Sequence, residues 1–258
     1  MRISTNKRIQ EIVDLLQKNG YVASNELAEK YNVSMETIRK DLMYLEEKGI
    51  VKKEYGGASL IALEQEASLD FRQDRADQKN QIARCVAKMI MENHSIILDS
   101  GSTCIACCKY MNLLPKKDII TNSLDAFMQL NGDTHNVFFT GGKKREKNHA
   151  VIGNWTEAYL NSIQVDVCIL GTAGLLNANG PTSHSYSELS TKKAMIEHSD
   201  LVYVVADSKK FNQKGFHTVV TWDKVDGIIT DSQISPNMYQ KFNKIVPVIV
   251  AGEENEND

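Results

Sequence analysis

The sequence predicts an α/β protein with two domains, a small helical domain at the N-terminus and a larger domain of alternating strands and helices. Apolar side chains recur at helical spacing through residues 6–48, whereas from residue 81 onward short Val/Ile/Leu-rich runs alternate with helical patterns. Near-continuous apolar strands separated by helices favour a mostly parallel sheet that is covered on both faces. The length of 258 residues also exceeds the roughly 100–200 of one domain.

The composition is that of a globular protein, with 42% apolar and 24% charged residues. A net charge of −3 excludes a polycation that binds nucleic acid by overall charge, so any such contact must come from a local patch. No run approaches the ~20 apolar residues of a membrane span, and the N-terminus lacks a signal-type apolar core. We therefore expect a cytoplasmic protein without membrane contact.

Five cysteines, without the spacing of a disulfide framework, indicate reduced thiols. Cys104, Cys107 and Cys108 cluster and include a C-x-x-C pair. A metal or redox site would need a second Cys or His pair nearby, and the sequence has none there. We expect thiols that pack between helices, and no metal site.

In the first domain, three helical patterns are followed by an alternating strand, a turn and a return strand. The predicted elements are helix 6–18, an extended piece at 21–23, helix 24–31 with Ser24 as its N-cap, helix 34–48 with Ser34 as its N-cap and Gly49 at its end, and a wing over residues 50–58. This order is the winged helix-turn-helix plan. Any three-helix bundle shows the same periodicity, so periodicity alone leaves both interpretations open.

The third helix has two different faces. Its apolar face is formed by Val33, Ile38, Leu42 and Leu45. The side chains left pointing outward near its N-terminal end are Met35, Glu36, Thr37, Arg39 and Lys40. A recognition helix docks that end on base edges in the major groove, so this helix is the candidate DNA reader.

The first domain is expected over residues 1–58, a polar linker over 59–78, the larger domain over 79–250 and an acidic tail over 251–258. Phe71-Arg72 is expected to anchor the linker on the larger domain. Within that domain the predicted helices are 82–91, 104–111, 124–130, 154–160 and 188–197, and the predicted strands are 95–99, 118–121, 137–140, 167–170, 201–206 and 227–229.

Small and polar residues follow four of these strands, in the loops 99–103, 121–123, 140–143 and 171–174. The carboxyl ends of parallel strands are where open α/β sheets bind ligands. The first loop also opens a helix, whose N-terminus offers free N–H groups to an anion. Hydroxyls, amides and backbone N–H groups without aromatic side chains suit a small polyhydroxylated, phosphorylated molecule. Glycine, serine and threonine are also ordinary turn residues, so each loop alone is a weak signal.

The N-terminal sequence closely resembles the DeoR family of bacterial transcriptional regulators. The resemblance is carried by Arg8, Glu26-Leu27-Ala28, Val33-Ser34, Thr37-Ile38-Arg39-Lys40-Asp41-Leu42 and Gly56-Gly57-Ala58. It implies DNA contacts from Ser24, Ser34, Met35, Glu36, Thr37, Arg39, Lys40, Lys52, Lys53, Tyr55, Gly56 and Gly57. The family usually has Arg at the positions of Lys40 and Lys53, and His at that of Tyr55. Because lysine lacks the planar fork that arginine presents to guanine, we expect Lys40 and Lys53 to contact phosphates.

Residues 71–231 resemble the DeoR-type sensor domain, which is similar in fold to ribose-5-phosphate isomerase. Gly180-Pro181-Thr182 and Ile228-Ile229-Thr230-Asp231 add to the strand-end loops in this resemblance. The implied ligand residues are Asp99, Ser100, Gly101, Ser102, Thr103, Asn122, Ser123, Gly141, Gly142, Thr172, Gly174, Glu188, Lys192, Asp207 and Lys210. Ser102 replaces a usual Thr, and Leu175-Leu176 stands where the family often has Ile-Asp, which puts sugar-hydroxyl recognition at that edge in question.

Together these features predict a repressor of a sugar-utilisation operon, controlled by a phosphorylated sugar or sugar alcohol and without a cofactor. One short recognition helix buries too little for tight binding, so a homodimer or homotetramer on an operator of repeated half-sites is expected. A sugar-phosphate isomerase is one alternative, but the Asp-Gly-Ala-Asp loop of those enzymes is replaced by Gly171-Thr172-Ala173-Gly174. Another alternative is a DNA-binding protein whose second domain only oligomerises. Glu188 and Lys192, four residues apart, also fit a plain helical ion pair.

Overall fold

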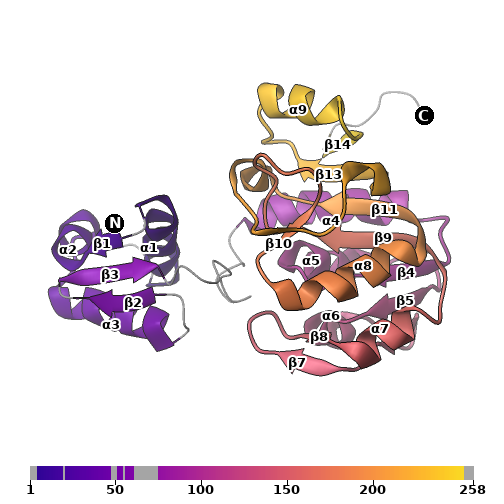
Figure 1. Ribbon diagram of the computed structural model, residues 1–258, viewed down its shortest axis with the longest axis horizontal. Coiled ribbons are helices and arrows are strands. Elements are labelled where there is room, and N and C mark those ends of the chain that lie inside the picture. Colours follow the sequence, from indigo (N-terminus) through magenta and orange to yellow (C-terminus); the bar gives the residue numbers. More distant parts are fainter. Residues whose placement is uncertain (1–4, 20, 48–50, 55, 61–74, 253–258) are drawn as a thin grey trace. The chain divides into compact units, whose positions relative to one another are not determined.

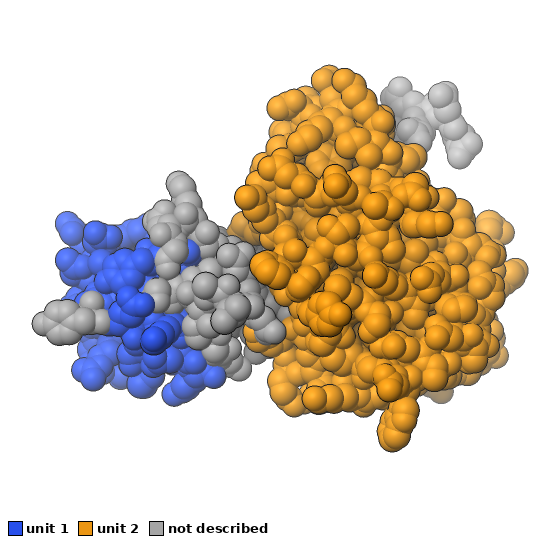
Figure 2. All heavy atoms as spheres, in the orientation of Figure 1, with its two compact units in different colours: residues 1–74 blue, residues 75–258 orange. Residues whose placement is uncertain are grey.

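The computed structural model describes residues 5–19, 21–47, 51–54, 56–60 and 75–252. The chain forms two compact units, residues 1–74 and 75–258, which Figure 2 distinguishes by colour. Each unit has its own hydrophobic core. The predicted helix end at Gly49, the predicted DNA contact at Tyr55, the anchor at 71–72 and most of the acidic tail lie outside the described residues.

The smaller unit confirms the predicted winged helix-turn-helix order. Its helices are α1 (Thr5–Asn19), α2 (Ser24–Tyr31) and α3 (Met35–Glu47), and its strands are β1 (Tyr21–Ala23), β2 (Val51–Glu54) and β3 (Gly57–Leu60). The strands β2 and β3 form the antiparallel wing. The extended piece β1 pairs with β3, so that the wing continues into a three-stranded sheet.

The hydrophobic core and one buried ion pair determine which face of α3 is turned toward solvent. Ile38, Leu42 and Leu45 are buried, as the apolar stripe predicted. Arg8 on α1 donates two hydrogen bonds to the Asp41 carboxylate on α3, Nε to Oδ2 at 2.6 Å and Nη2 to Oδ1 at 3.1 Å. Both side chains are buried, and the hydrogen bond with Asp41 raises the pKa of Arg8. A buried, two-pronged pair of this kind holds α3 in one orientation.

The two predicted N-caps have different outcomes. Ser34 Oγ accepts a hydrogen bond from the Thr37 N–H at 3.2 Å, which confirms it as the cap of α3. The prediction for Ser24 is wrong, because the N-cap of α2 is Ala23 and no side chain caps the helix there. The reason is that β1 pairs with β3 as far as Ala23, so the extended backbone of a cap falls one residue earlier.

The larger unit contains a seven-stranded sheet in the order β14-β13-β11-β9-β4-β5-β6, and all its pairings are parallel (Figure 1). The strands are β4 (Ser95–Leu98), β5 (Asp118–Thr121), β6 (Asn136–Phe139), β9 (Val165–Gly171), β11 (Ser199–Val205), β13 (Gly227–Asp231) and β14 (Val248–Ala251). The predicted parallel sheet is confirmed. Two antiparallel strand pairs were not predicted. One is the hairpin of β7 (Lys143–Arg145) and β8 (Ala150–Ile152), and the other pairs β10 (Thr182–Ser183) with β12 (His217–Thr218), which is distant in the sequence.

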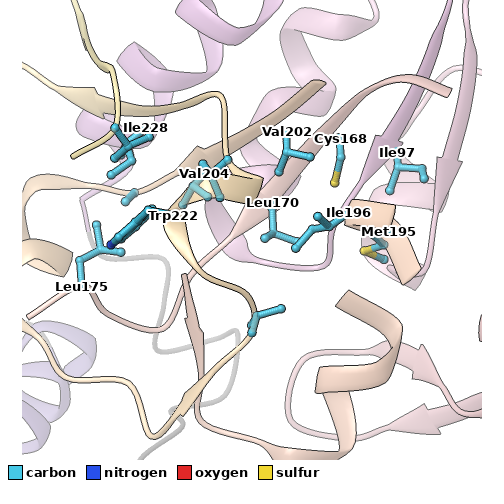
Figure 3. Close-up of a cluster of buried hydrophobic side chains, with 14 of the residues drawn as sticks. Ile97, Cys168, Leu170, Leu175, Met195, Ile196, Val202, Val204, Trp222 and Ile228 are labelled. Atoms are coloured by element: carbon cyan, nitrogen blue, oxygen red, sulfur yellow. The ribbon is translucent and has the colours of Figure 1, made fainter. Parts of the chain in front are cut away.

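Helices cover both faces of the sheet. They are α4 (Ala76–Met89), α5 (Ser102–Met111), α6 (Leu124–Gln129), α7 (Asn154–Leu160), α8 (Leu189–Glu197) and α9 (Pro236–Asn243), with short turns η2 (Tyr186–Glu188), η3 (Ser208–Asn212) and η4 (Trp222–Lys224). The helices α4, α5 and α6 contribute to one buried cluster. The helices α7, α8 and α9 contribute to another, in which Leu170 and Val204 of the sheet lie with Ile196 of α8 (Figure 3).

The cysteines on α5 pack as predicted. Cys104, Cys107 and Cys108 are fully buried in the cluster that α4 and α5 form with the sheet. Burial raises the pKa of each thiol, that of Cys108 to about 12. In the described ranges no three potential metal ligands gather in one place. Nor does any helix there have the length and apolar character needed to cross a membrane.

The order of strands singles out one place in the sheet. The strand β4 comes first in the chain, β5 and β6 follow on one side of it, and β9, β11, β13 and β14 follow on the other. The direction of winding therefore reverses between β4 and β9. Ligands of open α/β sheets bind at such a switch point, outside the carboxyl ends of the strands.

Candidate ligand site and DNA-binding surface

On the smaller unit, the predicted reader side chains lie on the exposed side of α3. Met35 is 53% exposed, and Glu36, Arg39 and Lys40 are also exposed, whereas Ile38 is buried. Thr37 is half-buried, and its hydroxyl lies 2.9 Å from that of Ser34. The exposed side chains near the start of α3 are therefore two cations, one carboxylate and one apolar group, with the Thr37 hydroxyl half-buried beside them.

The wing contributes two lysines with different surroundings. Lys52 is exposed. Lys53 is half-buried, and its Nζ lies 3.5 Å from Glu46 Oε2 on α3. Gly56 has a φ of +82°, which suits the turn of the wing. A Cβ at Gly57 would lie 2.1 Å from the Val22 carbonyl oxygen, so this glycine allows β3 to approach β1.

At the switch point, Asp99 connects three elements. It follows β4 and is 1% exposed. Its Oδ2 accepts a hydrogen bond from the N–H of Gly171, at the end of β9, at 2.9 Å, and another from the ammonium of Lys192 on α8. Lys192 Nζ also donates to the Gly171 carbonyl at 3.2 Å. Burial by itself lowers the pKa of Lys192, but the carboxylates of Asp99 and Glu188 raise it above its ordinary value, which keeps the ammonium charged.

A second buried carboxylate, that of Glu188, lies in the same network. Its Oε2 accepts a hydrogen bond from Ser183 Oγ at 2.7 Å, and its Oε1 accepts one from Asn148 Nδ2 at 2.6 Å. Arg145 Nη1 is 3.4 Å from the same Oε1. Asn148 Nδ2 also lies 3.2 Å from Ser100 Oγ, so the network reaches back to the loop after β4.

Arg145, Asn148 and Ser183 are site residues that the sequence analysis missed. Arg145 and Asn148 belong to the β7–β8 hairpin, and Ser183 to β10. These strands are only two or three residues long, too short for a period of two to be visible. The signal that could have located them is the basic run 143–147 directly after Gly141-Gly142, at the end of a predicted strand.

The start of α5 offers backbone N–H groups to a ligand. Its N-cap is Gly101, and within the described ranges no side chain caps the helix. The backbone of this loop packs closely against β9, because a Cβ at Gly171 would lie 3.2 Å from Asp99 Oδ2 and 3.4 Å from the Gly101 Cα. Ser102 is half-buried and Thr103 is buried. The free N–H groups of a helix first turn, next to hydroxyls, favour binding of a phosphate group.

The loops after β5 and β6 lie next to the β7–β8 hairpin. Asn122 Nδ2 donates to the Val151 carbonyl at 3.1 Å, and Asn122 Oδ1 is buried without a hydrogen-bond partner among the described residues. Ser123 is fully buried, and its Oγ caps α6 by accepting from the Ala126 N–H at 3.2 Å. Gly142 has a φ of +129°, and a Cβ there would lie 2.3 Å from Thr156 Oγ1. Gly141 has a φ of +68°, and its carbonyl accepts a hydrogen bond from Thr156 at 2.6 Å.

The remaining predicted ligand residues lie along the other half of the sheet. Thr172 and Gly174 hydrogen-bond to Thr182 of β10. Lys210 Nζ donates to the Ala173 carbonyl at 3.2 Å. Asp207 caps η3 by accepting from the Lys209 N–H at 3.0 Å. The structure thus joins Asp99, Ser100, Glu188 and Lys192 in one buried network, whereas the carboxylate of Asp207 is engaged elsewhere.

Comparisons with known proteins cover both units. Residues 8–63 match the model of the DeoR-like helix-turn-helix domain, and residues 74–232 match that of the DeoR C terminal sensor domain. A putative aga operon transcriptional repressor of Escherichia coli O157:H7 is 29% identical over 96% of this chain and 95% of its own. The glycerol-3-phosphate regulon repressor of Escherichia coli K12 is 29% identical over 88% and 90%, and the transcriptional repressor AccR of Agrobacterium fabrum 32% identical over 89% and 90%.

Among solved structures, ribose 5 phosphate isomerase A from Neisseria gonorrhoeae is similar at 17% identity and a TM-score of 0.37, over 54% of each chain. The β subunit of eIF2B from Chaetomium thermophilum is similar at 14% identity and a TM-score of 0.43, over 87% of this chain and 65% of that one.

Proposed function

The chain belongs to the DeoR family and is a DNA-binding transcriptional regulator, and from that premise we propose that it represses an operon for the use of a sugar or polyol under the control of a phosphorylated effector. The observation that carries the effector proposal is the buried network at the β4/β9 switch point. It joins an ammonium, two carboxylates and two hydroxyls next to the uncapped start of α5.

The chemistry of this network favours a ligand with both a phosphate and several hydroxyls. The N–H groups at the start of α5, with Ser102 and Thr103, suit the phosphate. The carboxylate of Glu188 and the orphan Oδ1 of Asn122 are acceptors that suit ligand hydroxyls. An apolar ligand would leave Asn122 Oδ1 without a partner, which costs about 1–3 kcal/mol.

The effector proposal is tested by thermal shift of the full chain. The panel consists of glycerol 3-phosphate, glucose 6-phosphate, fructose 6-phosphate and ribose 5-phosphate, with the unphosphorylated compounds and inorganic phosphate as controls. Stabilisation grows as RT ln(1 + [L]/Kd), so a ligand at about 100 times its Kd adds about 2.7 kcal/mol. We expect at least one phosphorylated compound to raise the melting temperature more than its matched control does. A flat response across a broad panel favours a domain that only oligomerises.

Operator binding is tested by gel shift on the DNA upstream of the chain's own gene and of the neighbouring operon. We expect a protein-dependent band that survives competition by random DNA. Absence of any band at low salt contradicts the assignment of α3 as a reader.

We expect no catalysis by this chain, because the curated relatives are named as regulators and the loop after β9 has no acid between Gly171 and Gly174. An isomerase of this kind needs a carboxylate base over the sugar carbon. Turnover of ribose 5-phosphate or a similar aldose phosphate by the purified chain would contradict this.

We further propose that the chain acts as a homodimer or homotetramer. The single recognition helix α3 has 13 residues, and regulators of this plan gain affinity by reading two half-sites about one helical turn of DNA apart. Sedimentation of the full chain with and without DNA measures the stoichiometry, and one chain bound per operator would contradict the proposal.

A further inference from the structure

Arg75 holds a strained position at the start of the larger unit. It is the N-cap of α4 and has a φ of +65°, in the left-handed region that favours glycine. An arginine remains in this region only when the surrounding structure fixes it. Residues 61–74 precede it and join it to β3, which ends at Leu60 in the DNA-binding unit.

The side chain of Arg75 lies against the carboxyl ends of two strands. Its Nη2 donates to Ser208 Oγ and to Gln233 Oε1, each at 2.8 Å. The same atom lies 3.5 Å from Asp231 Oδ1, at the end of β13. Its Nε lies 3.7 Å from Asp207 Oδ1, just after β11. Both carboxylates are buried, so the guanidinium compensates charge that would otherwise be costly there.

Asp207 in turn is connected to the loop of the ligand site. The main-chain carbonyl of Asp207 accepts from the Lys210 N–H at 2.8 Å, and Lys210 Nζ donates to the Ala173 carbonyl at 3.2 Å. The Lys210 carbonyl accepts from the Leu175 N–H at 2.8 Å. Two residues before Ala173 is Gly171, which is hydrogen-bonded to Asp99. A continuous series of contacts therefore runs from the Asp99 network to Arg75.

One contact in this series is incomplete. Arg75 Nε is buried and has no hydrogen-bond partner in the described part of the chain, because 3.7 Å to Asp207 permits an ion pair but not a hydrogen bond. A movement of Asp207 by about 0.5–1 Å would bring the pair to ordinary hydrogen-bond length. A small movement of Asp207, the N-cap of η3, would therefore complete the bonding of Arg75, and Lys210 belongs to the same short helix.

We infer that Arg75 is a positioning residue that couples occupancy of the ligand site to the segment joining the two units. The inference rests on the proposed function, since it requires an effector and an operator. A ligand that rearranges the loop 171–175 also shifts Lys210 and Asp207. This shift changes the contacts of the Arg75 side chain and, through them, the backbone conformation of Arg75, the residue that follows the segment 61–74. The ligand alters operator affinity only to the extent that it favours one state of this contact over the other.

The test uses the full chain, the upstream DNA and the panel compound that stabilises the protein most. Arg75→Asn removes the guanidinium while keeping a residue that tolerates the left-handed backbone. The matched control is Arg84→Gln, which removes a guanidinium from the same helix, where Arg84 bonds to Tyr110. For the wild type and Arg84→Gln, we expect the compound to change operator affinity by about 5–150-fold, a typical range for allosteric coupling.

For Arg75→Asn we expect the compound to raise the melting temperature as it does in the wild type, but to change operator affinity less than twofold. An unchanged ratio of affinities overturns the inference. Loss of the thermal shift also overturns it, because Arg75 would then support ligand binding itself. The proposed function fails separately, when the wild type lacks a thermal shift or an operator complex.

A second measurement needs no ligand. Asp207→Asn removes the other charge of the same contact and keeps an acceptor for the Lys209 N–H. Operator affinity is measured for Arg75→Asn, Asp207→Asn and the double variant. We expect each single variant to change affinity more than twofold and the double variant to match either single one within twofold, because all three break one contact. Unchanged affinities, or effects that multiply, overturn the inference.

Discussion

Asp99 and Lys192 show how far the ligand site depends on single side chains. Their charges neutralise each other in a place where each side chain is at most 9% exposed. Asp99 is also the side chain that joins β4 to β9, through its bond from the Gly171 N–H. The sequence marked Asp99 as a strand-end residue and left Lys192 as either a site residue or part of a helical ion pair. Its partner in the structure is 93 residues away.

At this pair, Lys192→Met leaves the buried Asp99 carboxylate without its cation. Removing one partner of a buried pair costs about 3–5 kcal/mol, whereas replacing both partners by neutral groups costs much less. We expect the double variant Asp99→Asn/Lys192→Met to be more stable than Lys192→Met alone. Urea unfolding of the two variants and the wild type measures the difference. A double variant less stable than Lys192→Met would mean that the charges are not coupled.

On the DNA-binding unit, Arg39 is the exposed residue of α3 best suited to read a base. Arg39→Ala should cost about 1–3 kcal/mol in operator binding and relax sequence preference at one position. Affinity is compared on operator and on random DNA of equal length, with Lys88→Ala on α4 as a surface control. Equal losses on both DNAs would make Arg39 a phosphate contact.

At the scale of elements, two serines of the smaller unit lie at the starts of helices but have different roles. Ser34 caps α3, whereas Ser24 follows the true N-cap of α2. Ser34→Ala should lower the free energy of unfolding by about 0.5–2 kcal/mol, the ordinary effect of losing a cap. Ser24→Ala is the matched control and should cost less. If Ser34→Ala and Ser24→Ala lose similar stability in thermal unfolding, the difference in capping between the two serines has no effect on stability.

His135 ties three elements together in the larger unit. It lies just before β6, its Nδ1 accepts from the Lys117 N–H at 3.2 Å, and its Nε2 lies 3.0 Å from the Met111 carbonyl at the end of α5. The ring that makes both bonds is the neutral tautomer protonated at Nε2. Burial lowers the pKa of His135, against the opposing effect of the Met111 carbonyl.

Because the pKa of His135 is lower in the folded state, the unfolded chain takes up its proton first as the pH falls. The contribution of His135 to stability is therefore present above about pH 6.5, the unfolded value, and decreases below it. Between pH 7.5 and 5.5, the wild type should lose more free energy of unfolding than His135→Gln, measured by urea denaturation. The other histidines are common to both proteins, so equal losses would contradict this role.

At the scale of the whole molecule, the net negative charge of the chain opposes binding to DNA, which is also negatively charged. The chain carries −3 overall, so its affinity for DNA must come from the local cations of α3 and the wing. Of these, Lys52 is exposed, whereas Lys53 is paired with Glu46 at 3.5 Å. A lysine already paired within the protein releases fewer counterions on binding a phosphate.

Lys52→Gln should therefore reduce the slope of log K against log salt by about 1, as expected when one phosphate contact is lost. Lys53→Gln should reduce it less. Operator affinity over a salt series measures both slopes. A larger change for Lys53 than for Lys52 would mean that DNA displaces Glu46 and takes over its partner.

The sequence by itself determined the two-unit plan and the parallel sheet, because these follow from local periodicity and from the order of strands and helices. The winged helix also required the resemblance to a family, because any three-helix bundle shows the same periodicity. The sequence also located the strand-end loops, since all parallel strands end at the same edge of a sheet. Resemblance to a family extended this to Glu188 and Lys192, which their spacing alone left as a plain helical ion pair.

Only the tertiary structure decided which of these residues meet. Asn148 joins Ser100 and Glu188 across 48 and 40 residues of sequence, and β1 moves the cap of α2 from Ser24 to Ala23 by pairing with β3. Such contacts depend on strands of two or three residues, which are too short to show a local period, and on the order of strands in the sheet. Burying polar groups is costly unless each has a hydrogen-bond partner, and these partners come together only when the sheet and its loops have folded.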